Sequence, residues 1–157
     1  MIIAVAAGLI VAGGGLFAYT RYFGAQSVIQ TNSDSVHCRQ GNIFDGVDRQ
    51  ARFTVLSSCE KAVGVMHDMK STKENDGDYQ FNLQVEEPYK KLLNNENVKQ
   101  VNGMLVTEII PKDQNDAKDV QIPKNGDRIE VYGAWVTDNP HGWNEIHPAW
   151  LVKVMGS

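Results

Sequence analysis

The sequence lacks the short motifs that identify common enzyme mechanisms. It has no CxxC pair, no HExxH metal motif, no glycine-rich phosphate loop and no nucleophile elbow. It also lacks a basic stripe, because 15 Lys and Arg residues are outnumbered by 19 Asp and Glu residues and the formal net charge is -4. Proteins that bind nucleic acid usually present a basic field to its phosphates. These absences argue against nucleic acid as a partner and predict no particular reaction.

Cysteine is scarce, and the chain has only Cys38 and Cys59. An even number of cysteines outside an apolar segment suggests a disulfide, and hence an oxidising, extracytoplasmic compartment. A disulfide closing a loop of about 20 residues stabilises a fold by roughly 3 kcal/mol in the chain-entropy model. The alternative is that the two are unrelated thiols. His37 beside Cys38 is not enough to predict a metal site.

The one long hydrophobic run covers residues 2–19 and contains no charge. As a helix it would extend roughly 27 Å, which is close to the thickness of the hydrocarbon core of a membrane. Aromatic residues and Arg21 follow it, as at a membrane interface. A cleaved signal peptide is the alternative, but no Lys or Arg precedes the run and bulky residues surround any cleavage point. We therefore predict a transmembrane anchor over residues 1–23, a polar linker over 24–35 and a globular domain over 36–157.

The orientation of this single-pass protein is predicted from two opposing signals. Arg21 alone would place the domain in the cytoplasm by the positive-inside rule. The paired cysteines favour the other side of the membrane. We predict a membrane protein with an extracytoplasmic C-terminal domain.

Apolar residues alternate with polar ones in several segments of the domain, which is typical of half-buried strands. Pro88 follows two acidic residues and precedes two lysines, which favours a short helix over residues 86–93. Gly133 predicts a bend or bulge, and Pro148 an edge strand or a bulge. The expected strands cover residues 52–70 (interrupted at 57–60), 78–85, 103–110, 126–136 and 145–154.

Five antiparallel strands and one short helix predict a mainly β fold, a small closed barrel. The segments VGVMHDMK, DGDYQFNL and GDRIEVYGAWV resemble strands of an OB-fold domain, over roughly residues 53–155. The expected helix departs from this resemblance, because it falls between the second and third strands and not between the third and fourth. The segment HGWNEIHP is also similar to a motif of membrane-anchored or exported microbial domains, a likeness that implies no activity.

The OB-fold resemblance implies that the loops over residues 70–78 and 138–143 flank a binding face. Trp143 is expected to be accessible there, whereas Trp135 and Trp150 are expected in the core. Glu145 and His147 should share the strand face opposite Ile146. The candidate binding residues are therefore Asp76, Asp78, His141, Trp143, Glu145 and His147.

The leading hypothesis is a non-catalytic, membrane-anchored binding or assembly domain, which needs no cofactor and whose partner is a protein or a small polar ligand. One alternative is a metal-dependent hydrolase in which His141, Glu145 and His147 hold a divalent metal. A second is an oligonucleotide-binding domain that uses its tryptophans for stacking. Glu145 and His147 also have a purely structural interpretation, in which they pair with the neighbouring strand and fix its register.

Overall fold

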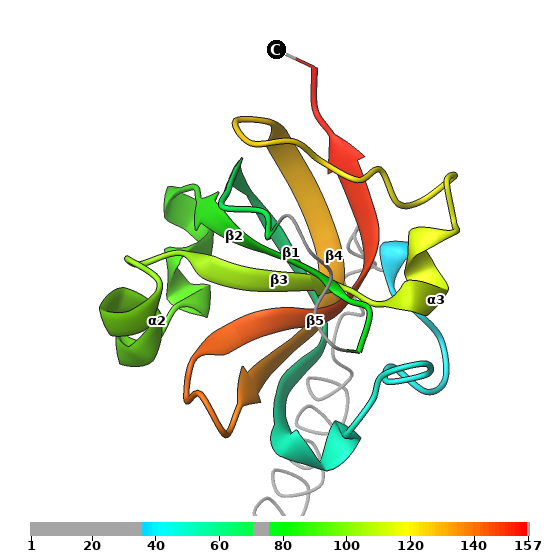
Figure 1. Ribbon diagram of the computed structural model, residues 1–157, viewed down its shortest axis with the longest axis horizontal. Coiled ribbons are helices and arrows are strands. Elements are labelled where there is room, and N and C mark those ends of the chain that lie inside the picture. The colour runs from blue at the N-terminus through cyan, green and yellow to red at the C-terminus, as the bar shows by residue number, and fades with distance from the viewer. Residues whose placement is uncertain (1–35, 71–75, 157) are drawn as a thin grey trace, which may run out of the picture. The chain divides into compact units, whose positions relative to one another are not determined.

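The computed structural model describes residues 36–70 and 76–156. Its five strands form a closed barrel with the order β1-β2-β3-β5-β4, completed by pairing of β1 with β4 (Figure 1). The mainly β barrel predicted from the sequence is therefore confirmed. The strands are β1 (Phe53–His67), β2 (Tyr79–Val85), β3 (Leu105–Ile109), β4 (Arg128–Asp138) and β5 (Asn144–Val154).

The prediction of a wholly antiparallel barrel is wrong at one pair of strands. β3 and β5 run parallel, whereas the other four pairs are antiparallel. Parallel neighbours need a long connection between them. Here that connection contains the short helix α3 (Pro111–Gln114), a loop and the whole of β4.

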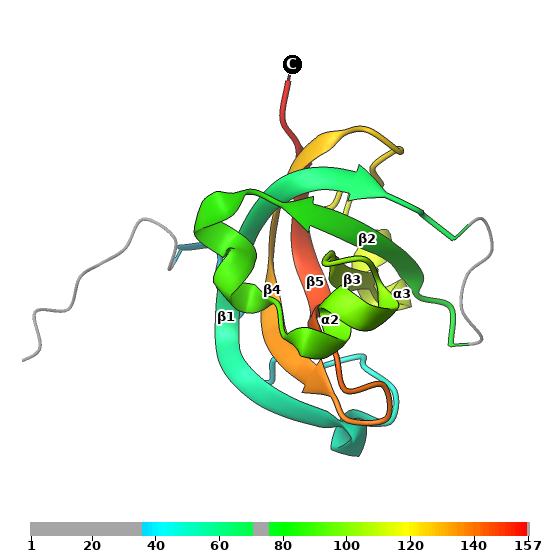
Figure 2. The ribbon, with the colours of Figure 1, turned by 90° about the vertical axis from the view of Figure 1, so that its left-hand side faces the viewer.

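Glycines stand where two strands approach each other closely. A Cβ on Gly64 of β1 would lie 2.3 Å from the carbonyl oxygen of Gln84, and one on Gly133 of β4 would lie 2.3 Å from that of Pro148. The β4–β5 register shifts on both sides of Gly133, which confirms the predicted bulge. The predicted interruption at residues 57–60 is likewise a register shift within a continuous β1, which curves around the barrel (Figure 2).

Pro148 lies in the interior of the sheet, so its predicted place on an edge strand is wrong. β5 pairs with β3 on one side and β4 on the other. The alternative prediction, a bulge, describes the site, because pairing with β4 skips from Ile146 to Ala149. A proline lacks a backbone N–H and fits where the ladder is already interrupted.

The single predicted helix is replaced by two short helical segments between β2 and β3, η3 (Glu87–Leu92) and α2 (Asn95–Gln100), which lie over one end of the barrel (Figure 2). Residues 94–97 begin α2, where the sequence had suggested the end of a helix. The Asn94 side chain accepts hydrogen bonds from the backbone N–H groups of Glu96 and Asn97, and Asn97 accepts one from Asn94 in return. This reciprocal capping satisfies N–H groups that a helix start leaves unpaired.

Two apolar clusters lie on opposite sides of the barrel wall. The inner cluster, which contains Phe81 and Leu105, receives side chains from all five strands and fills the barrel. The outer cluster lies on β4 and β5, where Tyr132 and Trp150 pack with Val47 and Phe53 from the segment before and at the start of β1. The predicted disulfide is present and ties this segment down, since Cys38 and Cys59 are bonded.

The predicted anchor over residues 1–23 and the linker over 24–35 lie outside the described residues. Among the residues that are described, no helix is long and apolar enough to cross a membrane.

Candidate functional site

A cavity of about 250 Å³, here called the polar pocket, opens on the barrel where the two loops singled out from the sequence meet. Asp76 lies on its β1–β2 side and His141 and Trp143 on its β4–β5 side. Arginines from the segment before β1 complete the rim. The lining residues are Arg49, Arg52, Lys70, Asp76, Gln80, Glu108, His141 and Trp143.

Asp138, at the end of β4, holds two of these side chains from below. Its carboxylate is fully buried, pairs with the Arg52 guanidinium and lies 2.6 Å from Nδ1 of His141. Burial alone would raise the pKa of Asp138, but the hydrogen bonds from Arg52 and His141 outweigh it and lower the pKa below its usual range. Asp138 therefore stays ionised and fixes the positions of the Arg52 guanidinium and the His141 imidazole.

Trp143 is positioned in a similar way. Its ring stacks on His141 with centroids 4.2 Å apart and an interplanar angle of 2°. Its indole N–H donates to Oε2 of the buried Glu145 at 2.8 Å. The other two tryptophans lie elsewhere: Trp135 packs against the inner cluster as expected, whereas Trp150 is in the outer cluster. Trp143 and Trp135 are both half-buried and Trp150 is buried, so exposure does not set Trp143 apart from Trp135; Trp143 differs in lining the polar pocket.

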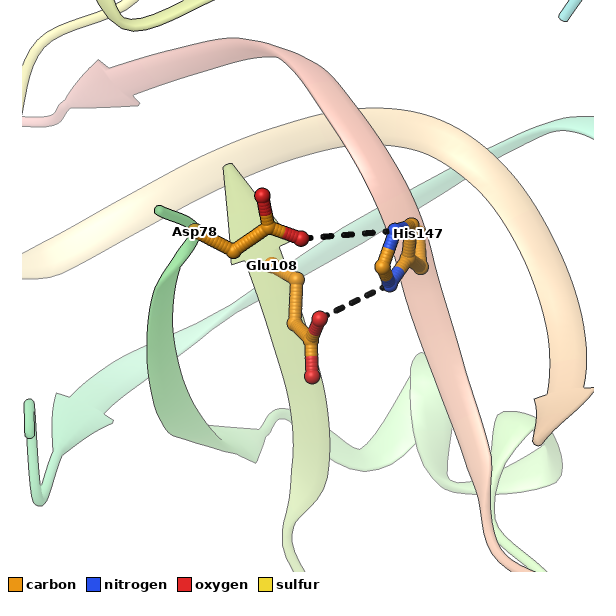
Figure 3. A group of neighbouring side chains, drawn as sticks. All are labelled: Asp78, Glu108 and His147. Carbon is orange, nitrogen blue, oxygen red and sulfur yellow. Dashed lines mark ion pairs between the residues drawn. The ribbon is translucent and has the colours of Figure 1, made fainter. Parts of the chain in front are cut away.

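Beneath the polar pocket lies a group of four ionisable side chains, here called the buried acidic cluster: Asp78, Glu108, Glu145 and His147. None is more than 5% exposed. Asp78 Oδ2 is 3.6 Å from His147 Nε2, while Glu108 Oε2 and Glu145 Oε1 are 2.9 and 3.2 Å from Nδ1. Figure 3 shows the Asp78 and Glu108 carboxylates pointing at the imidazole, from the start of β2 and from β3 respectively.

These short distances are ion-pair contacts without hydrogen-bond alignment. Both ring nitrogens of His147 and Oε1 of Glu145 are buried and lack an aligned partner. Two other carboxylate oxygens have aligned donors, since Glu108 Oε1 accepts from Gln80 at 2.6 Å and Glu145 Oε2 accepts from Trp143 at 2.8 Å. Buried polar atoms are nearly always paired in native proteins, so three such atoms at one point mark the cluster as unusual.

The cluster shifts the pKa values of its members in opposite directions. Burial alone would lower the pKa of His147, but its contacts with Glu108 and Glu145 raise it to about 10. Burial raises the pKa of Asp78 to about 7 against the opposing effect of His147, and burial also raises the pKa of Glu145. Burial would likewise raise the pKa of Glu108, but the close contact with His147 and its charge lower it. Perturbed values of this kind are concentrated at functional sites.

The metal set expected from the sequence is brought together only in part. Glu145 and His147 are in contact, but His141 turns to Asp138 and stacks on Trp143. Asp78 and Glu108 stand beside His147 instead, and these three form the one group in the described residues whose ligand atoms all lie within 4.8 Å of one another. The turn after β4 places His141 beside Asp138 and Trp143. Counting residues along a strand does not reveal contacts made within a turn.

Glu108 is the residue that the sequence reasoning missed. It is a lone charge inside the apolar segment GMLVTEII, and that was the available signal, because an unpaired buried carboxylate is rare. Glu145 and His147 were correctly expected on the strand face opposite Ile146. They are nevertheless buried, because the segment leading into β1 covers this face and the Phe53 ring lies 4.6 Å from that of His147.

Comparisons of the chain with protein-family models, with curated proteins and with solved structures found no match.

Proposed function

We propose that the protein is a non-catalytic, membrane-anchored binding protein whose extracytoplasmic domain takes a small polar ligand with an anionic group into the polar pocket. The observation that carries this proposal is the second layer of carboxylates under the pocket. Asp138 holds Arg52 and His141, and Glu145 holds Trp143. Side chains fixed in this way lose little conformational freedom when a ligand binds, which is the property of a preorganised site.

The chemistry of the rim favours an anion at the mouth of the pocket. Arg49, Arg52 and Lys70 all line it, and Arg49 lies 3.4 Å from Asp76 with 64% of its side chain exposed. An exposed guanidinium in a loose ion pair can exchange its partner for a ligand carboxylate or phosphate. The stacked His141 and Trp143 rings offer an apolar wall for the rest of the ligand.

The anchor and the compartment are part of the proposal and rest on separate support. The uncharged run over residues 2–19 supports an anchor, and the Cys38–Cys59 disulfide supports an oxidising compartment. N-terminal sequencing of the protein isolated from membranes tests the anchor. A start after Ala18 or Ala25 would identify a cleaved signal peptide instead.

The binding proposal is tested by titrating the full-length protein with succinate in buffer containing EDTA, followed by calorimetry and tryptophan fluorescence. The neutral 1,4-butanediol is the matched probe without charge. Succinate should bind at one site and change the fluorescence, and butanediol should do neither. Arg49→Gln should weaken succinate binding about three- to tenfold, since one charge-assisted hydrogen bond is lost at a partly solvated site.

Arg128→Gln is the matched control, because Arg128 is also exposed and ion-paired but belongs to the Glu86 pair outside the pocket. It should bind succinate like the wild type. Equal weakening in both variants would indicate a general charge effect and contradict the proposed site. Absence of saturable succinate binding in the wild type would contradict the anionic ligand class.

A further inference from the structure

We propose that the buried acidic cluster is a binding site for one divalent metal ion of the zinc class, with Asp78, Glu108 and His147 as ligands. Glu145 is a positioning residue that orients the imidazole. This inference goes beyond the proposed function, which needs no metal, and it differs from the ligand set expected from the sequence by excluding His141.

The first argument is the charge of the cluster. Three carboxylates surround one imidazole in a region that is almost closed to solvent. The charge of Arg52 reaches Glu108 and Glu145, but Arg52 is already paired with Asp138. Uncompensated buried charge is strongly unfavourable, and buried carboxylates are normally paired or coordinate a metal. A divalent cation would supply the counter-charge that three ionised carboxylates around one imidazole need.

The second argument is the set of unpartnered atoms. His147 is 3% exposed, and neither of its ring nitrogens has an aligned hydrogen-bond partner, although carboxylate oxygens lie close to both. Nε2 has the Asp78 carboxylate beside it at 3.6 Å, too far for a hydrogen bond, which leaves room for a cation between them.

The distances fit an ion without rebuilding the barrel. In tetrahedral coordination with bonds of about 2.0–2.1 Å, neighbouring ligand atoms are about 3.4 Å apart. Asp78 Oδ2 and His147 Nε2 are 3.6 Å apart, and all three ligand atoms lie within 4.8 Å of one another. In Figure 3 Asp78 faces one ring nitrogen and Glu108 faces the other, so Glu108 has to turn from Nδ1 toward Nε2 to share the ion with Asp78.

Nδ1 of His147 has two carboxylates beside it, Glu108 at 2.9 Å and Glu145 at 3.2 Å, and Glu145 stays there when Glu108 turns to the ion. Oε1 of Glu145 makes this contact, while Oε2 accepts the Trp143 indole N–H. Histidines that bind a metal through one nitrogen usually donate the other N–H to a carboxylate or carbonyl, which fixes the tautomer. With His147 Nε2 on the ion, Glu145 has this role.

The donor set selects the class of ion. One imidazole nitrogen and two carboxylates suit Zn²⁺ and its neighbours in the first transition row. Mg²⁺ and Ca²⁺ prefer oxygen ligands alone. Because Glu108 also lines the polar pocket, the remaining coordination position faces that pocket and takes water or an anionic group.

The test uses full-length protein stripped with EDTA and dialysed against Zn²⁺, Mn²⁺ or Mg²⁺, with the bound metal measured by elemental analysis. One Zn²⁺ per chain is expected, with weaker Mn²⁺ binding and no Mg²⁺ binding. Asp78→Asn should lower Zn²⁺ affinity at least tenfold. Asp113→Asn is the matched control, because Asp113 is also a buried carboxylate but is paired with Arg39 outside the cluster, and it should leave affinity unchanged.

A second measurement on the wild type does not depend on variant folding. Co²⁺ bound to stripped protein should give the visible absorption of a low-symmetry nitrogen and oxygen site, and Zn²⁺ should displace it. The proposal is overturned by less than stoichiometric Zn²⁺, by a Co²⁺ spectrum without imidazole coordination, or by unchanged affinity in folded Asp78→Asn. Succinate binding is measured in EDTA, so failure of the metal site leaves the proposed function standing, and the reverse also holds.

Discussion

The inner cluster and the buried acidic cluster are equally hidden from solvent but differ in every other respect. Phe81 and Leu105 inside the barrel are at most 1% exposed, and Glu145 and His147 on the outside are at most 3% exposed. The inner cluster is apolar and is enclosed by the five strands and by Leu92 of η3. The acidic cluster is ionic and is closed by a separate covering segment, which ends in Phe53.

The comparison shows that burial has two opposite effects on the stability of this domain. Burial of apolar side chains is the driving force for closing the barrel, at roughly 25 cal/mol per Å² of surface removed from water. Burial of carboxylates opposes folding unless a counter-charge is supplied. The inner cluster thus accounts for stability, while the acidic cluster is retained at a cost, which is expected of a site selected for binding.

The largest expected effect is on the inner side of the comparison. Phe81→Ala should lower the free energy of unfolding by about 3–5 kcal/mol, because a large ring is removed from a closed interior that cannot collapse around the gap. Urea denaturation followed by circular dichroism measures this loss. A loss below about 1 kcal/mol would show that the barrel interior rearranges freely, and the contrast between the two regions would disappear.

The next effect concerns the ionic side, at Asp138. Asp138→Asn should lower the free energy of unfolding by about 2–3 kcal/mol at neutral pH, because Arg52 loses its buried counter-charge. Since the folded-state pKa of Asp138 lies below the ordinary value of 3.8, its contribution is present above that pH and is lost as the pH falls through the folded-state pKa. The difference between wild type and variant should therefore shrink below about pH 3.8.

Denaturation curves at several pH values test this, with Asp45→Asn as a control for an exposed carboxylate in an ion pair. The control should behave like the wild type at neutral pH. A difference for Asp138→Asn that stays constant down to pH 2 would contradict the assignment of an ionised Asp138.

The smallest effect on stability is expected at Trp143, which joins the polar pocket to the buried acidic cluster. Trp143→Phe keeps most of the ring but removes the indole N–H, so Oε2 of the buried Glu145 loses its donor. An unsatisfied buried acceptor costs about 1–2 kcal/mol. Trp135→Phe is the matched control at the inner cluster. It also removes an indole N–H, which in the wild type donates to the Leu92 carbonyl. Thermal unfolding measures the stability of both variants. An unchanged melting temperature in Trp143→Phe would show that the burial of Glu145 does not depend on the hydrogen bond from Trp143.

Much of the barrel was predictable because its strands leave a local signal. Tyr79, Phe81, Leu83 and Val85 alternate with polar residues, and the structure pairs this segment as β2. Gly133 and Pro148 predicted an interruption in the hydrogen bonding between β4 and β5, which the register shift confirms. The α2 helix was missed because Asn94 and Asn97, which normally favour turns, cap each other and begin a helix here.

The candidate site was only half predictable, for a different reason. The loop residues Asp76, His141 and Trp143 were found because polar turns flank strands at the ends of a barrel. Glu108 was not found, and His141 was assigned to the wrong neighbours. The position of Glu108 depends on which strands become adjacent, and the parallel pairing of β3 with β5 is set by connections far along the chain. His141 contacts Asp138 and Trp143 of its own turn instead of the strand residue His147.

The sequence by itself determined the strand-forming segments, the bulge at Gly133 and the pairing of two lone cysteines, because periodicity, backbone freedom and cysteine number act locally or allow one solution. Only the tertiary structure decided that Glu145 and His147 are buried and that Asp78 and Glu108 meet them. Exposure on a strand face depends on what covers it, and the covering segment before β1 is distant in sequence from β5. The side chains that give this domain its unusual chemistry are brought together by closure of the barrel, a property of the whole chain.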